Sequence, residues 1–172
     1  MLQLISLVML IYSFFLIRTS LPLLPARIPT HFNASGVADT WGSPDALWTL
    51  LGAQALTCVV FLVVPYLSQR FPGAVHLGRR RLSDFSPAQR ARMLPLLNEM
   101  TGYMAVLMSL FFVWMLRQML AAARAPNPHL SPLWPMVLLL SGTLVVTWYY
   151  LKRLRLAGKD PGDGEAADNL KP

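Results

Sequence analysis

Four long apolar runs constrain the fold of this chain more than any other feature of its sequence. They cover residues 1–17, 46–69, 100–121 and 132–151, and the only charged side chain inside them is Arg117, near the end of the third run. A helix needs roughly 20 mainly apolar residues to cross a bilayer. A charge at the centre of such a helix would cost about 2.5–3.5 kcal/mol on insertion. The runs therefore predict an all-α integral membrane protein of four transmembrane helices, with an ordered outer loop after the first.

The composition agrees with burial in lipid. Hydrophobic residues make up 55 % of the 172 residues and charged residues only 13 %, about half the charged fraction of a soluble domain. We expect a four-helix membrane domain over residues 1–155. The remaining residues, 156–172, offer little apolar surface to bury and are predicted to form a disordered cytoplasmic tail.

The first run has a competing interpretation as a cleaved signal peptide. Such a peptide would begin with basic residues and end in small residues before a cleavage site. Here no Lys or Arg occurs before Arg18, and the chain continues through Pro22 and Pro25. These features favour a retained helix.

Serine followed by proline marks several helix starts. Serine accepts a hydrogen bond from a free N–H of the first turn, and proline lacks the N–H that would be unpaired there. Gln89, three residues after Ser86, completes a capping box. The helix that starts there is expected to kink or break at Pro95 before the third span. The three pairs are Ser43–Pro44, Ser86–Pro87 and Ser131–Pro132.

Basic residues predict the orientation. They concentrate in the loop between the second and third runs and after the fourth run, whereas the other two loops hold only Arg18, Arg27, Arg117 and Arg124. Basic loops stay on the cytoplasmic side, so we expect both termini inside and the first and third loops outside. The same distribution explains the net charge of +7 without nucleic acid, and we predict no nucleic-acid partner.

The loop of residues 18–45 holds a dense polar and aromatic motif that begins Ile28-Pro29-Thr30-His31-Phe32-Asn33. The prolines disfavour helix, and Asn33 and Gly36 suit a turn, the glycine by accepting a positive φ. Phe32 and Trp41 carry rings that can lie at the headgroup level. The candidate binding residues are Pro29, His31, Phe32, Asn33, Gly36, Asp39 and Trp41.

Two interpretations of the polar residues in this motif stay open. His31, Asn33 and Asp39 either bind a lipid headgroup, a peptide or a metal, or they bond to one another and to the backbone and hold a compact cap over the bundle. A metal is the weakest option, because one histidine and one aspartate fall short of the three or four ligands of a zinc site. We therefore predict no metal and no cofactor.

The motif resembles the family known as domain of unknown function 1648. The likeness rests on a Leu-Pro-x-x-Ile-Pro-x-His-Phe-Asn-x-x-Gly-x-x-Asp pattern directly after a first membrane helix, which here runs from Leu24 to Asp39. Some members look like immunity proteins against a secreted sporulation-delaying peptide toxin, and these carry a second membrane module that this chain is too short to hold in full. Many relatives also have a lysine where this chain has Pro44. The resemblance implies a bacterial cytoplasmic (inner) membrane protein with several spans.

Together these features predict a non-enzymatic membrane protein with a sensing or immunity-type role at the outer face. Its expected partners are the lipid bilayer, a peptide or lipid headgroup at the outer loop, and a membrane protein. The alternative is a small transporter or an accessory subunit of a membrane complex, in which Gln54 and Thr57 would line a path, although interhelical hydrogen bonding explains them equally well. An enzyme is disfavoured because no nucleophile has a recognisable setting.

Two further predictions concern packing and the remaining histidines. Gly102, Ala105 and Ser109 fall on one face of the third span, and such small residues let helices approach closely. We expect this seam to pack within the chain rather than between two chains. His76 and His129 have no partner visible in the sequence, and solvated loops are expected for both.

Overall fold

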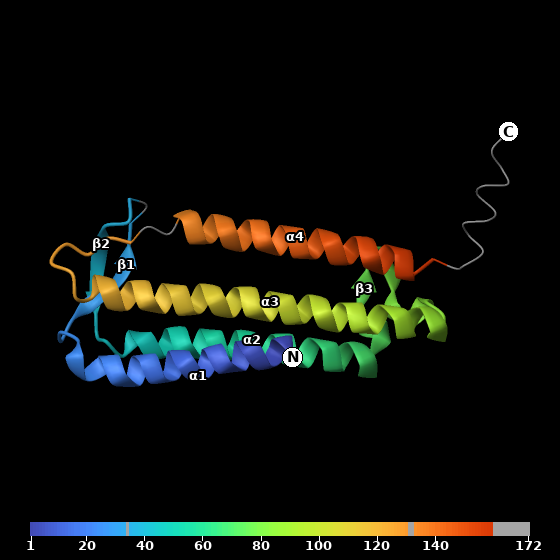
Figure 1. The fold of residues 1–172 in the computed structure, drawn as a ribbon, viewed down its shortest axis with the longest axis horizontal. Coiled ribbons are helices and arrows are strands. Elements are labelled where there is room, and N and C mark those ends of the chain that lie inside the picture. Colours follow the sequence, from blue (N-terminus) through green and yellow to red (C-terminus); the bar gives the residue numbers. More distant parts are fainter. Residues whose placement is uncertain (34, 131–132, 160–172) are drawn as a thin grey trace.

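The computed structural model describes residues 1–33, 35–130 and 133–159. Within them, four long helices run side by side along the longest axis of the molecule (Figure 1). They are α1 (Leu2–Ser20), α2 (Ala46–Arg70), α3 (Pro87–Ala122) and α4 (Leu133–Ala157). All four are long and apolar enough to cross a membrane, as the four runs predicted.

Two helices extend beyond the residues that were expected to end them. α1 passes Arg18 and is followed by a short 3₁₀ helix, η1 (Leu21–Leu23). α2 begins at Ala46, as the second run predicted, although Ser43 and Pro44 lie in a turn before the helix rather than at its first positions. α4 extends to Ala157, beyond both residue 151 and the expected domain boundary at 155. The expected disordered tail from residue 160 onward lies outside the described residues, as do Ser131 and Pro132.

The start of α3 is confirmed, and of the kink or break expected at Pro95 the break is wrong. Gln89 N–H donates to Ser86 Oγ at 3.2 Å and Ser86 N–H to Gln89 Oε1 at 2.8 Å, which is the capping box. The helix then runs without a break through Pro95 to Ala122. Proline removes one backbone hydrogen bond, but the neighbouring side chains of Met93, Leu96 and Leu97 are buried. Their packing on both sides of the proline stabilises the continuous helix.

The expected all-α fold needs correction, because two small antiparallel sheets connect the helices. One pairs β1 (Ile28–Phe32) with β2 (Ala38–Gly42), and the other pairs β3 (His76–Leu77) with β4 (Arg80–Arg81). Short 3₁₀ helices flank the second sheet, η2 (Pro72–Ala74) and η3 (Leu82–Asp84). The prolines that exclude helix from residues 25–29 leave that backbone extended, and the tight turn after it returns the chain as a second strand.

The helices form a bundle of three with a fourth added at one side. α1, α2 and α3 contact one another, and α4 packs mainly on α3, on the side away from α1 and α2 (Figure 1). Two clusters of buried apolar residues lie at opposite ends of the molecule. The first joins Ile17, Ile28, Leu47, Leu116, Leu120 and Ala123 beside β1. The second joins Leu82, Met93, Leu96, Leu97, Tyr150 and Leu154.

Small residues line the contact between α1 and α3. Gly102, Ala105 and Ser109 are all buried, and a Cβ on Gly102 would lie 2.8 Å from Cβ of Leu2. The predicted packing seam within the chain is therefore confirmed. Besides Ile17, the buried residues of α1 are small and polar and lie seven apart, Ser6, Ser13 and Ser20, and these allow the same close approach.

The outward faces of the helices are apolar. Leu56 on α2 and Leu138 on α4 are 64 % and 67 % exposed, and many leucine, valine and phenylalanine side chains of the four helices are likewise exposed. A soluble monomer rarely exposes so continuous an apolar surface. This surface suits the hydrocarbon of a bilayer.

Candidate functional site

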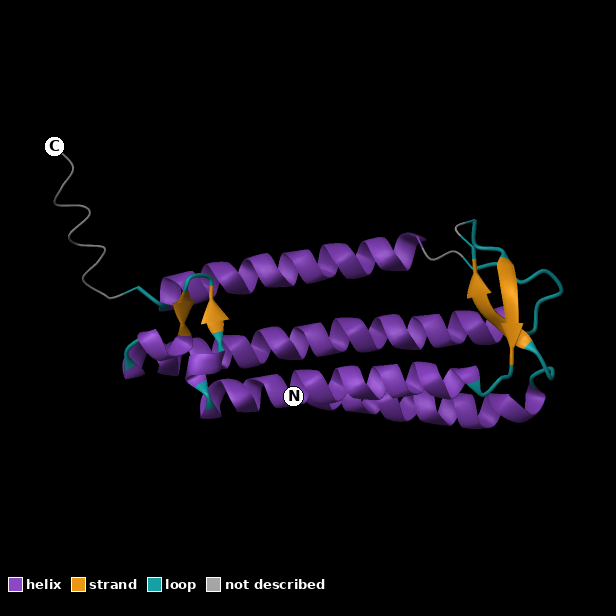
Figure 2. Cartoon of the chain, turned by 180° about the vertical axis from the view of Figure 1, so that it is seen from behind, coloured by secondary structure: helices purple, strands orange, loops and turns teal. Residues whose placement is uncertain are grey.

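The motif forms a β-hairpin at one end of the bundle, beyond the ends of the helices (Figure 2). In β1, Ile28 and Pro29 are fully buried, and Ile28 packs in the first core cluster with Ile17 and Leu47. Ile28 pairs with Gly42 and Pro29 with Trp41, followed by shifts of register on either side of His31. The start of the hairpin is thus fixed to the bundle by burial.

Asn33 and Gly36 hold the turn of the hairpin. Oδ1 of Asn33 accepts hydrogen bonds from the backbone N–H groups of Ser35 and Val37, both at 3.0 Å. The N–H of Gly36 donates to the carbonyl of Asn33 at 2.8 Å, and Gly36 has a φ of 80°. The turn predicted at these two residues is confirmed, and their hydrogen bonds give Asn33 a structural role.

The loop between α3 and α4 docks on the same turn. Leu130 N–H donates to the carbonyl of Gly36 at 2.8 Å, and Val37 forms an isolated β-bridge with His129. The ring of His129 lies beside Gly36, since a Cβ on that glycine would be 3.0 Å from Cε1 of the ring. His129 was expected in a solvated loop, and no local pattern indicates this contact because the two segments are more than 90 residues apart.

His31 and Asp39 form an exposed pair across the two strands. Nδ1 of His31 lies 2.6 Å from Oδ1 of Asp39, and the two side chains are 66 % and 42 % exposed. Thr40 Oγ1 also donates to Asp39 Oδ1, at 3.4 Å. With its proton on Nδ1 the imidazole donates to the carboxylate, so the pair presents a carboxylate and a ring to whatever approaches this end of the molecule.

The hydrogen bond from His31 lowers the pKa of the Asp39 carboxyl below its ordinary value of 3.8. Because the folded-state pKa is the lower one, the contact stabilises the hairpin above about pH 3.8. It is lost as the pH falls through the folded-state value. In His31→Ala the pKa of Asp39 is expected to rise toward its ordinary value, as followed by carboxyl ¹³C NMR. His76→Ala, at the other sheet, should leave that titration unchanged. Equal Asp39 titrations in wild type and His31→Ala would contradict the assigned cause.

The aromatic residues of the motif differ in exposure. Trp41 is 42 % exposed on β2, while Phe32 is only partly exposed. The guanidinium of Arg27 donates to the carbonyl of Trp41 at 3.0 Å, which adds a cation to the exposed side of the hairpin. Arg27 was not among the predicted site residues, since nothing in its spacing points to a residue 14 positions later.

The residues proposed for a transport path do not share one environment. Gln54 is 2 % exposed, and its Nε2 has no hydrogen-bond partner within the described residues. The hydroxyl of Thr57 donates to the carbonyl of Ala53 within its own helix at 2.9 Å. Among the described residues no three His, Cys, Asp or Glu side chains lie close enough together to hold a metal ion.

Comparison with known proteins places the motif in a family. Residues 4–57 match the family described as Domain of unknown function (DUF1648). Neither a curated protein nor a solved structure matches the chain. The matched segment contains most of α1, the whole hairpin and the first half of α2. The resemblance of the motif to the DUF1648 family is therefore confirmed over residues 4–57.

Proposed function

We propose that this is a non-enzymatic membrane protein that recognises a ligand at the outer face of a bacterial cytoplasmic membrane, in a sensing or immunity role. The observation that supports recognition most is the exposed His31–Asp39 pair on an otherwise anchored hairpin. The immunity role is supported only by the resemblance of the motif to immunity proteins.

The charge distribution supports an outward-facing hairpin. Arg80 and Arg81 form strand β4 and Arg79 directly precedes it, and Lys152 and Arg153 lie near the end of α4. Both groups are at the end of the bundle opposite the hairpin (Figure 1). Basic residues are retained on the cytoplasmic side, so the hairpin would face outward and both termini inward.

Some residues of the motif stabilise the hairpin, and others remain exposed and able to bind a ligand. Burial of Ile28 and Pro29 and the turn bonds of Asn33 account for its shape. An exposed cross-strand pair adds little to stability, about 0.2–1 kcal/mol in general. His31 and Asp39 are therefore held close together although their contact contributes little to the stability of the hairpin.

The chemistry of the exposed groups indicates the class of ligand. The lowered pKa of Asp39 keeps its carboxylate ionised at neutral pH, and Trp41 on the same strand exposes part of its ring. A carboxylate attracts an ammonium group, and an indole face does so as well. Peptides and amine-bearing lipid headgroups both carry such a group, and we propose that the ligand is one of these.

Native mass spectrometry tests the proposal. The full chain is purified in mild detergent from the membranes of the cells that express it. Wild type is expected to retain an added mass that His31→Ala/Asp39→Ala loses. The matched control is His76→Ala/Asp84→Ala, which removes one histidine and one aspartate from the opposite end of the bundle. It changes the protein mass and formal charge identically.

Each outcome separates two interpretations. An added mass lost only from the hairpin variant supports recognition, and its size distinguishes a peptide from a lipid. An added mass that both variants keep, or none in wild type, rejects a ligand held by His31 and Asp39. A hairpin variant with reduced thermal stability and no ligand in wild type would instead assign the pair to holding the cap.

A further inference from the structure

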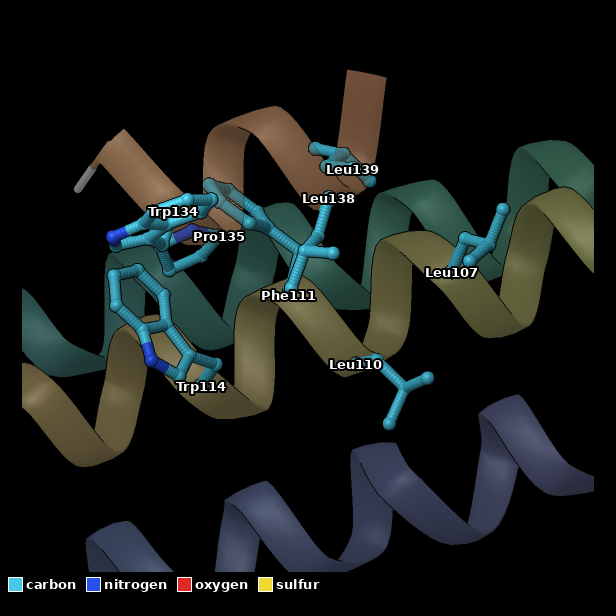
Figure 3. Close-up of a pocket in the computed structure, with 8 residues that line it drawn as sticks. All are labelled: Leu107, Leu110, Phe111, Trp114, Trp134, Pro135, Leu138 and Leu139. Atoms are coloured by element: carbon cyan, nitrogen blue, oxygen red, sulfur yellow. The ribbon is translucent and has the colours of Figure 1, made fainter. Parts of the chain in front are cut away.

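α4 packs against α3 unevenly along its length. Its buried residues within the described part are Tyr150 and Leu154, both near its C-terminal end. Toward the hairpin, a cavity of about 510 Å³ separates the two helices (Figure 3). The helices approach each other again at Gly142, where a Cβ would lie 3.4 Å from a methyl group of Leu107. We call this space, between that contact and the hairpin end, the α3–α4 cleft.

Apolar side chains line the α3–α4 cleft. Phe111 and Trp114 come from α3, with stacked rings whose centroids are 6.0 Å apart. Trp134 and Pro135 lie across the cleft from them on α4 (Figure 3). Apart from the indole N–H groups, the lining side chains carry no hydrogen-bonding group, so the cleft suits an apolar occupant.

The depth of the cleft distinguishes an acyl chain from a partner helix. From Leu107 to Trp114 is seven residues, or about 10 Å of helix. The hydrocarbon of one leaflet is about 15 Å thick, half of the whole core, and a transmembrane helix must cross both leaflets. The cleft closes at Gly142, so it accommodates a chain that enters from one leaflet only. The tryptophans at its open end are the residues favoured at the membrane interface.

Two arginines lie beyond the open end of the cleft. Arg117 follows Leu110, which lines the cleft, by seven residues on α3, and such spacing places residues on nearly one face of a helix. Arg124 lies in the turn just after α3 ends at Ala122. Both side chains are exposed, and neither forms a salt bridge with any described residue. Arginine binds phosphate through paired hydrogen bonds.

From these observations we infer that the α3–α4 cleft binds a glycerophospholipid of the leaflet on the hairpin side. One acyl chain fills the cleft between Phe111 and Leu138, and the phosphate lies at Arg117 and Arg124. The site depends on insertion of the helices in a membrane but not on any ligand of the hairpin.

Native mass spectrometry of the delipidated full chain, titrated with dioleoylphosphatidylglycerol, tests this inference. Wild type is expected to retain one lipid under conditions that strip the rest. Leu139→Trp fills the cleft with a larger side chain and should abolish that retention. Arg117→Gln should weaken it about tenfold, the effect of losing a charge-assisted hydrogen bond. The matched controls are Leu140→Trp, next along α4 but outside the lining, and Arg79→Gln at the opposite end of the bundle.

Several outcomes would overturn the inference. Equal retention in wild type and Leu139→Trp would exclude the cleft, and equal loss in Leu140→Trp would indicate non-specific lipid around the bundle. A dimer that forms as lipid is removed and is blocked by Leu139→Trp would assign the cleft to a second copy of the chain. If Leu139→Trp does not fold, a second measurement compares wild type with Trp114→Phe/Trp134→Phe. Phosphatidylglycerol brominated in its acyl chains should quench the tryptophan fluorescence of wild type more strongly than that of the double variant. Quenching equal to that of the double variant would also reject the site.

Discussion

Replacing Gly36 with alanine is expected to detach the hairpin from the loop between α3 and α4. The new Cβ would lie 2.1 Å from the carbonyl oxygen of Leu130, and it would sit on a backbone with a φ of 80°. A left-handed conformation costs a residue other than glycine about 1–2 kcal/mol. The hydrogen bond from Leu130 N–H to Gly36 would be lost as well, at about 0.5–1.5 kcal/mol. Together they predict about 1.5–3.5 kcal/mol less stability for this docking.

Amide hydrogen exchange measures this effect at the residues concerned. The N–H groups of Leu130 and Ala38 bond across the two segments and should exchange much faster in Gly36→Ala. Gly78→Ala is the matched control, because Gly78 also has a positive φ, 69°, but a Cβ added there would have no neighbouring atom within 4 Å. Gly78→Ala should lose only the stability that the left-handed backbone conformation costs, and the hairpin amides should stay protected from exchange. Exchange at Leu130 in Gly36→Ala as slow as in wild type would contradict the expected detachment of the loop.

The loop between α3 and α4 also supports the motif from a second side. The conformation of Gly36 is part of a contact between the hairpin and residues 128–130. A ligand bound at His31 and Asp39 would therefore meet a hairpin supported on both sides, by the bundle at Ile28 and by the loop at Leu130. Such support reduces the conformational entropy lost on binding.

Features that depend on local chemistry were predictable from the sequence. The apolar runs located the four long helices, the spacing of Ser86 and Gln89 located the start of α3, and Asn33 with Gly36 located a turn. In each case the residues that decide the structure are neighbours in the chain. The pairing of β1 with β2 was missed, although the residues on both sides of that turn were identified.

Which distant segments contact one another was not predictable. The contact of His129 with the hairpin joins parts of the chain far apart in sequence, and no local pattern encodes it. Continuity of α3 at Pro95 depends on the packing of Met93 and Leu97 in a cluster that includes α4. The exposure of His31 and the burial of Pro29, two residues away, likewise depend on how the strand lies on the bundle.

Labelling of single cysteines tests whether the hairpin faces outward. Ser35 at the hairpin turn and Ala74 beside the other sheet are both exposed. Each would be replaced by cysteine in a Cys58→Ser background, since Cys58 is the chain's only cysteine. A charged maleimide does not cross the hydrocarbon core, so only an outward-facing cysteine reacts in intact cells.

Ser35→Cys is expected to be labelled in intact bacterial cells, and Ala74→Cys only after the membrane is made permeable. This difference should be nearly all or none, because a four-helix crossing places the two ends of the bundle on opposite sides. Labelling of Ala74→Cys with protection of Ser35→Cys would reverse the orientation and contradict recognition at the outer face. Equal labelling of both in intact cells would contradict a membrane crossing between them.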